Sequence, residues 1–79
     1  MTKDIIRTFA KLESQVQLKR KDLAKYNIEK LERLLKVESE LLEARSERYL
    51  SSEKGQKSLE DIEASQAKLL NYKIMLDID

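Results

Sequence analysis

Four glutamates in one short stretch are the side chains of this sequence with the clearest capacity for chemistry. Glu40, Glu43 and Glu47 are spaced by three and four residues, so a helix would place them on one side, and Glu38 lies just before them. Neighbouring carboxylates can act as acid and base or bind a metal ion. Carboxylate metal sites in helical bundles also use histidine, however, and the chain has none. We interpret the glutamates as a solvated acidic flank.

The residue types that are missing exclude most other chemistry. The chain has no cysteine and no histidine, which rules out a disulfide framework, nucleophile–histidine catalysis and the common zinc, haem and iron–sulfur sites. Its single glycine cannot form a glycine-rich phosphate-binding loop. The sequence therefore predicts a protein that is not an enzyme, with no catalytic residue, no metal site and no cofactor.

Basic side chains concentrate in the N-terminal third and predict contact with an anionic partner as one function. Residues 1–26 contain seven basic and three acidic side chains, whereas the remainder contains nine and twelve. Phosphate contacts by such residues would give salt-sensitive nucleic-acid binding with little reading of bases. No aromatic platform accompanies them and the net charge is only +1, so we favour a solvated face or a protein contact, with nucleic acid as the alternative. The residues concerned are Lys3, Arg7, Lys19, Arg20, Lys21 and Lys25.

The composition predicts that helices position these groups. The chain has 79 residues, of which 39% are charged and 41% hydrophobic, with no proline. Most of them are strong helix formers, and such a leucine-periodic chain with balanced charge is typical of long exposed helices or a coiled coil. No apolar run is longer than Ile74–Leu76, so we predict a soluble protein with neither a secretory signal nor a membrane span. A cytoplasmic location is then the default.

We predict a single all-α domain, a helical hairpin of one long and one shorter antiparallel helix. The first helix covers residues 3–52, a turn over 53–57 contains Gly55, and the second helix covers 58–76. Ser58 begins a segment with the spacing of a capping box, which favours a helix start at that position.

Three alternatives to this hairpin stay open. In the first, Ser51 or Ser52 caps a second helix that contains Gly55. In the second alternative, one helix continues through residues 53–57 without a break. In the last, a bend near Tyr26–Asn27 converts the chain into a three-helix bundle, although asparagine is a weak helix breaker and neither glycine nor proline stands beside it.

An apolar stripe on the first helix predicts self-association. The second helix is about 30 Å long at 1.5 Å per residue and covers only the latter part of the first, which is about 75 Å long. The N-terminal stripe is then uncovered, so we expect a homodimeric, coiled-coil-like helical bundle. The predicted oligomer interface consists of Ile5, Phe9, Leu12, Val16, Leu23, Ile28, Leu31, Leu35, Glu38, Leu42 and Arg45.

Two charged residues lie within this apolar face, one heptad apart. In one interpretation the long side chains of Glu38 and Arg45 reach out to solvent. In the other they pair across an antiparallel dimer centred near Leu41–Leu42, where Glu38 of one copy meets Arg45 of the second. Polar pairs on such a seam fix its register at some cost in stability.

The C-terminal segment is the most hydrophobic part of the chain. Leu70, Ile74 and Met75 form a candidate docking patch for another protein, with core closure at the end of the hairpin as the alternative. The sequence thus predicts a non-enzymatic, homo-oligomeric interaction module: an adaptor, assembly factor, small chaperone or inhibitor of a larger protein. The alternative is a dimeric nucleic-acid-binding accessory protein that uses the basic N-terminal half.

Overall fold

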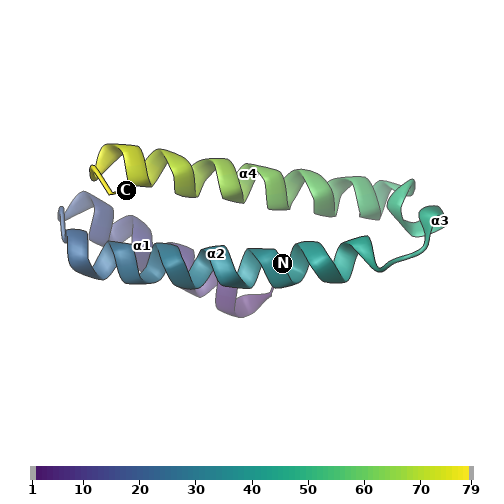
Figure 1. The fold of residues 1–79 in the computed structure, drawn as a ribbon, viewed down its shortest axis with the longest axis horizontal. Coiled ribbons are helices and arrows are strands. Elements are labelled where there is room, and N and C mark those ends of the chain that lie inside the picture. The colour runs from purple at the N-terminus through teal and green to yellow at the C-terminus, as the bar shows by residue number, and fades with distance from the viewer. Residues whose placement is uncertain (1, 79) are drawn as a thin grey trace.

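The described part of the chain consists of three long helices and one short one. The computed structural model describes residues 2–78, and this range contains no β-strand, which confirms the predicted all-α class. In Figure 1, α2 and α4 run side by side, and α1 lies along α2 from the middle of the molecule to the end where α4 finishes. The molecule measures 43 × 21 × 17 Å. The helices are α1 (Lys3–Gln17), α2 (Lys21–Glu43), α3 (Glu47–Leu50) and α4 (Glu53–Met75).

Hydroxyl side chains begin three of these helices. Thr2, Ser46 and Ser52 each accept a hydrogen bond from the backbone N–H three residues later, at 3.2–3.4 Å. These bonds satisfy N–H groups that have no partner inside the helix. The predicted turn over 53–57 and the helix start at residue 58 are therefore wrong, and the alternative cap at Ser52 is correct.

The predicted continuous helix over residues 3–52 is also wrong, because the chain reverses direction between α1 and α2. Lys19 adopts the left-handed conformation, with a φ of 54°. The Arg20 N–H donates to the Gln15 carbonyl at 2.9 Å and the Lys19 N–H to the Val16 carbonyl at 3.1 Å, which is the Schellman arrangement that ends helices. Glycine commonly occupies the left-handed position, and a lysine there leaves no mark in the sequence.

The bend that one of the alternatives placed near Tyr26–Asn27 is not found, since both residues lie inside α2. Asn27 is buried and has a different role. Its side-chain amide donates a 2.7 Å hydrogen bond to the side-chain oxygen of Gln15, twelve residues earlier. This bond joins α2 to α1 and compensates for the burial of a polar amide.

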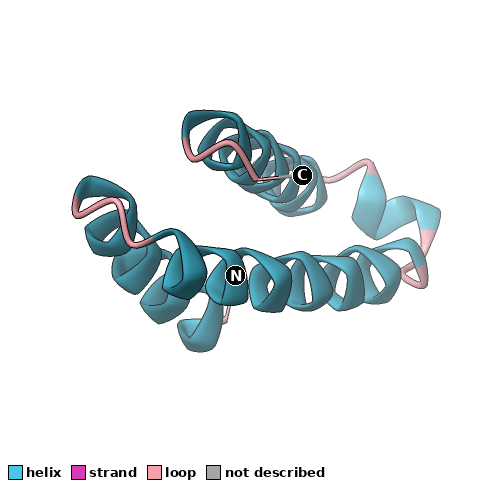
Figure 2. Ribbon diagram, turned by 60° about the vertical axis from the view of Figure 1, so that its left-hand side comes forward, coloured by secondary structure: helices cyan, strands magenta, loops and turns pink. Residues whose placement is uncertain are grey.

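The second reversal passes through α3 and depends on Gly55 in the first turn of α4. Figure 2 shows this connection at the end of the molecule opposite to the α1–α2 loop. A β-carbon on Gly55 would lie 2.1 Å from the Tyr49 carbonyl oxygen and 2.9 Å from the Leu50 α-carbon. Both atoms are backbone, so only a residue without a side chain allows α3 and α4 to approach this closely.

The hydrophobic core lies where α1, α2 and α4 meet. Phe9, Leu34, Tyr72, Leu76 and Ile78 pack against it from its edges. A core shared by three helices within one chain covers the N-terminal stripe that a simple hairpin would leave exposed. The fully and nearly fully buried members are Ile5, Leu12, Val16, Ala24, Ile28, Leu31, Leu35 and Leu69.

Two ion pairs connect α4 to the other long helices. The ammonium of Lys68 lies 2.6 Å from a carboxylate oxygen of Glu13, and that of Lys73 lies 3.0 Å from one of Glu32. The hydrogen bond from Lys68, followed by its charge, lowers the pKa of Glu13. Because the folded-state pKa is lowered, the contribution of this pair is present above the ordinary carboxyl pKa and is lost as the pH falls. Both residues are exposed, so salt screens the pair.

Candidate interaction surfaces

The eleven residues of the predicted oligomer interface lie in different places in the structure: some in the core, some at the surface and some in a groove. Phe9 packs half-buried against the core, and Leu23 is 48% exposed. Seven of the eleven are buried inside the chain: Leu42 lies under α4, and the other six belong to the core that α1, α2 and α4 share. These six are Ile5, Leu12, Val16, Ile28, Leu31 and Leu35. The prediction that they form an exposed seam is therefore corrected by the fold.

Leu42 and the remaining two members, Glu38 and Arg45, line a groove between the second half of α2 and the first half of α4. We call it the distal groove. Its volume is about 160 Å³, and α1 contributes no residue to it. At 1.5 Å per residue, α1 is about 22 Å long and α2 about 34 Å, so α1 ends before it reaches this part of α2. The groove is lined by Glu38, Leu41, Leu42, Arg45, Tyr49, Ser58, Asp61 and Ile62.

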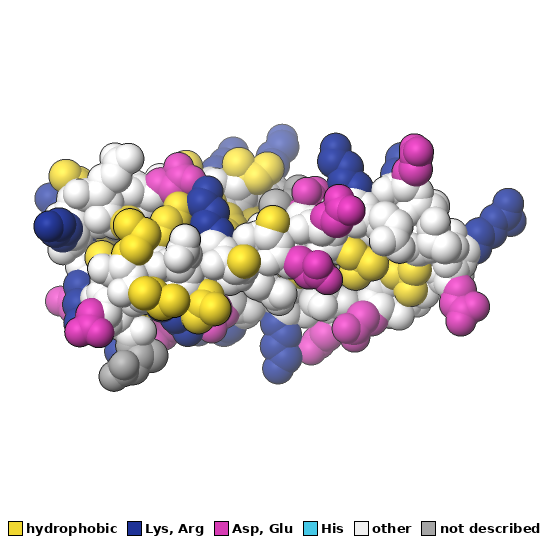
Figure 3. Space-filling model, turned by 90° about the horizontal axis from the view of Figure 1, so that it is seen from above, with side chains coloured by type: hydrophobic (Ala, Val, Ile, Leu, Met, Phe, Trp, Pro, Cys, Tyr) yellow, Lys and Arg dark blue, Asp and Glu magenta, His cyan; other side chains and the backbone are white. Residues whose placement is uncertain are grey.

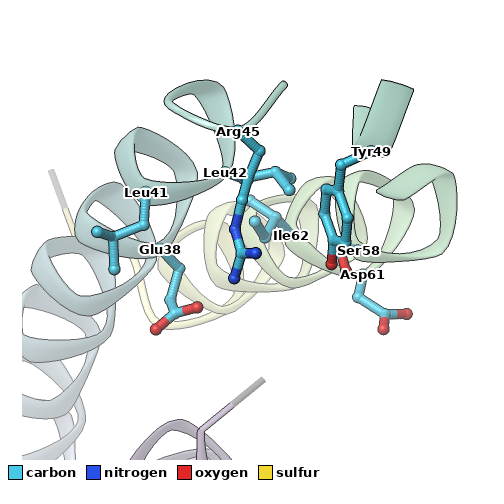
Figure 4. A pocket seen from close by; sticks show the side chains of 8 residues that line it. All are labelled: Glu38, Leu41, Leu42, Arg45, Tyr49, Ser58, Asp61 and Ile62. Carbon is cyan, nitrogen blue, oxygen red and sulfur yellow. The ribbon is translucent and has the colours of Figure 1, made fainter. Parts of the chain in front are cut away.

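Charged side chains border an apolar floor in the distal groove. Figure 4 shows Arg45 extending across Leu42 and Ile62, between Glu38 on one side and Tyr49 on the other. The guanidinium carbon of Arg45 lies 4.8 Å from the centre of the Tyr49 ring, which is a cation–π contact. Within residues 2–78 the ion pairs are those of Lys68 and Lys73, so Glu38 and Arg45 face the same groove without forming an ion pair with each other.

Part of this groove is missing from the sequence prediction. The sequence predicted a helix start at Ser58, with a capping box that would extend three residues further, to Asp61. Because α4 begins five residues earlier, both instead lie on the α4 side of the groove, beside Ile62. Correct placement of the Ser52 cap would have moved them to the helix interior and so indicated the role that they have.

The glutamates considered for acid–base or metal chemistry do not converge. Glu40 and Glu43 are exposed on α2, whereas Glu47 is exposed on α3, beyond a break in the helix. Glu38 is half-buried in the distal groove. In the described range, residues 2–78, no group of three or more acidic side chains is placed to hold a metal ion.

The six basic residues of the nucleic-acid hypothesis do not form one column. Because the chain reverses after α1, Lys3 lies roughly 22 Å from the α1–α2 loop that carries Lys19 and Arg20. Lys19 and Lys21 line a shallow depression with Val16, Met75 and Leu76. The basic loop therefore lies beside aliphatic side chains of α4, and Arg7 and Lys25 are exposed on separate helices.

The C-terminal residues predicted as a docking patch are exposed. Their spacing on α4 places Leu70 and Ile74 on one side of the helix, whereas Met75 is turned toward the α1–α2 loop. Leu70, Ile74 and Met75 are 60%, 69% and 65% exposed. Leu70 borders a depression beside Glu32, whereas Met75 faces the basic loop. Figure 3, seen from above, shows hydrophobic side chains scattered among charged ones over this end of α4.

A row of mostly apolar side chains lies along one side of α2, next to the side that is buried in the core. Its members follow one another at intervals of three and four residues, as in a coiled-coil seam. Four of them are 48–64% exposed, and the two in the middle, Lys30 and Leu34, are half-buried. We call this surface the outer seam; it consists of Leu23, Tyr26, Lys30, Leu34, Val37 and Leu41.

Charge is distributed unevenly along the molecule. The end with the α1–α2 loop, formed by residues 3–31 and 65–78, carries ten basic and five acidic side chains. The opposite end, formed by residues 32–64, carries six basic and nine acidic side chains. The long axis of the molecule therefore runs from a basic end to an acidic end.

Comparisons with protein-family models, with curated proteins and with solved structures find no match to this chain. Among the helices of residues 2–78, none combines the length and the apolar content that crossing a bilayer requires.

Proposed function

We propose that the chain is a non-enzymatic helical interaction module that works as a self-associating protein. The outer seam of α2 is the observation that carries this proposal. Of the nine large hydrophobic side chains found exposed, four lie on this seam: Leu23, Tyr26, Val37 and Leu41. Contiguous apolar surface on a small charged protein is typical of a contact with another protein.

The shape of the surface supports a helix as the occupant rather than a small molecule. The outer seam is a helix face rather than a pocket, and the distal groove beside it holds only about 160 Å³, although other, open depressions of the surface reach about 320–400 Å³. Sites for small molecules are concave and usually enclose about 300–1,000 Å³. A neighbouring helix, in contrast, fits side chains into the gaps of a seam with this spacing.

The free energy available predicts a weak dimer. Two copies would bury ten apolar side chains of the seam, each already partly covered, for about 1 kcal/mol apiece. Association costs about 4–15 kcal/mol, so little net free energy remains. We expect a dissociation constant in the micromolar range or above. Such a module is dimeric where its local concentration is high.

Nucleic-acid binding is the second candidate, and one observation favours it. Lys19, Arg20 and Lys21 are exposed in succession at the basic end, and none belongs to an ion pair of residues 2–78. Their neighbours Met75 and Leu76 are aliphatic, however, whereas single-stranded nucleic acid is held on aromatic platforms. This environment supports a protein contact more than a nucleic-acid contact.

Sedimentation equilibrium tests self-association. We expect the average mass to rise above the 9.3 kDa of one chain as the concentration increases from about 10 µM to about 1 mM. Leu41→Ser should raise the dissociation constant about thirtyfold, because it removes one large apolar side chain from each copy, a loss of about 2 kcal/mol. Leu70→Ser is the matched control: both leucines are 60% exposed, but Leu70 is on α4, so this change should have little effect.

Two outcomes would contradict the proposal. A mass of 9.3 kDa at every concentration would show that the chain does not self-associate. Salt-sensitive binding to a 20-nucleotide single strand, lost when Lys19 and Lys21 are replaced by alanine, would favour the second candidate instead.

A further inference from the structure

We infer that the outer seam is covered by the outer seam of a second copy, antiparallel and in full overlap, so that Leu23 of each chain lies against Leu41 of the other. This inference rests on the proposed self-association and adds its surface, orientation and register. It differs from the dimer centred near Leu41–Leu42, which overlaps only at one end.

The spacing of the residues in the outer seam is nearly the same when it is read from either end. Leu23 and Leu41 are nine residues before and nine residues after position 32. Lys30 and Leu34 are two residues on either side of the same position, and Tyr26 and Val37 are six before and five after it. A two-fold axis at the middle of α2 therefore brings seam residues against seam residues along a length of about 27 Å.

The charges at the two ends of the molecule favour a second copy as the partner of the outer seam. They also favour the antiparallel orientation over the parallel one. In an antiparallel pair with its axis at position 32, the basic end of each chain lies beside the acidic end of the other. A parallel pair would place the two basic ends together and the two acidic ends together. Opposite potentials across an interface favour association and suppress the wrong arrangement.

The middle of the seam contains one polar member, which contributes to the register. Lys30 is half-buried, and in the full overlap it lies beside Leu34 of the second copy, close to the axis. A shift by one helical turn would place this ammonium against a different part of the seam and separate Leu23 from Leu41. Single polar residues at such positions are known to specify register in coiled coils.

The groove-to-groove dimer is disfavoured by the charges of the distal groove. Each groove contains two carboxylates, those of Glu38 and Asp61, and one guanidinium, that of Arg45. Two grooves facing each other would bring four carboxylates to two guanidinium groups. In the full overlap of two outer seams the charged members that approach each other are the two Lys30 side chains, whose flexible stems allow the ammonium groups to reach solvent at the edge of the interface.

Disulfide cross-linking in mixtures of two variants tests the inference, since the chain has no cysteine of its own. Leu23→Cys and Leu41→Cys chains, each pure, should form little disulfide dimer, because identical positions are about 27 Å apart. A mixture of the two should form a linked heterodimer in high yield, since facing cysteines reach the roughly 5.5–6 Å α-carbon spacing of a disulfide. The control mixture of Leu23→Cys with Leu70→Cys should stay unlinked.

Other cross-linking results would reject the register, the orientation or the self-association separately. Rapid linking of Leu41→Cys alone, in a protein that sediments as a dimer, would indicate the dimer centred near Leu41–Leu42 and reject the full overlap while self-association survives. Linking of both pure variants would indicate a parallel dimer and reject the orientation. A monomeric mass for the wild-type chain, with no linking in any mixture, would reject the proposed function as well.

Discussion

Leu35→Ser is expected to unfold most of the chain at 25 °C, whereas Leu41→Ser should leave its helix content unchanged. Leu35 is 0% exposed in the core that α1, α2 and α4 share, while Leu41 is 60% exposed six residues later on the same helix. Removal of a buried leucine side chain costs about 2–5 kcal/mol, and a domain of this size has a total stability of only a few kcal/mol. Far-UV circular dichroism with urea titration at low protein concentration measures both variants.

This comparison separates the core from the surface within one helix. The two substitutions are chemically identical and lie on the same element, so helix propensity affects them equally. Equal loss of stability in the two variants would mean that the assignment of the inner and outer sides of α2 is wrong.

Gly55→Ala is expected to destabilise the protein, although alanine is the better helix former by about 1 kcal/mol. The new β-carbon would lie 2.1 Å from the Tyr49 carbonyl oxygen, and neither this atom nor the Leu50 α-carbon belongs to a flexible side chain. The α3–α4 corner must therefore shift, and we expect a net cost of about 1–3 kcal/mol. The midpoint of urea unfolding reports this cost.

Ala67→Gly supplies the control for this substitution. Ala67 is exposed inside α4, so its replacement by glycine should cost about 1 kcal/mol through helix propensity alone. Glycine-to-alanine and alanine-to-glycine changes in this one helix should therefore both destabilise the protein. A higher unfolding midpoint for Gly55→Ala would show that the corner does not require glycine.

Helix formation was predictable from the sequence, because propensity and periodicity agree throughout. The absence of proline, the leucine spacing and the serine caps predict an all-α chain. The apolar positions Ile5, Leu12 and Val16 were also identified correctly as one face. What the sequence did not reveal was the partner of this face, since a stripe that packs on the same chain and one that packs on a second copy have the same pattern.

The reversal at residues 18–20 could not be predicted for a local reason. Lys19 occupies a left-handed position for which glycine is the usual signal, and Leu23 continues the apolar stripe beyond the loop. The stripe thus resembles that of one continuous helix. This missed reversal led to a hairpin in place of three packed helices.

The outer seam was only partly predictable, because two adjacent leucines face opposite environments: one is buried and the other is exposed. Leu42 is 6% exposed and Leu41 is 60% exposed, yet both carry the same side chain. Which of them faces inward depends on the position of α4, a tertiary property. The seam became evident only when the inward side of α2 was known.

The distance between two spin labels in the dimer reports the orientation and the overlap of the two α2 helices. Glu43→Cys places one nitroxide per chain at an exposed position at the end of α2, away from the outer seam. With the axis at position 32, the two labels lie about 33 Å apart along the helices, and the lateral spacing raises the expected separation to about 35–40 Å. Pulsed dipolar spectroscopy at high protein concentration should show this distance. A separation below about 25 Å would mean that the ends of α2 meet, and the absence of any dipolar signal would mean that the chain is a monomer; either result would contradict the account.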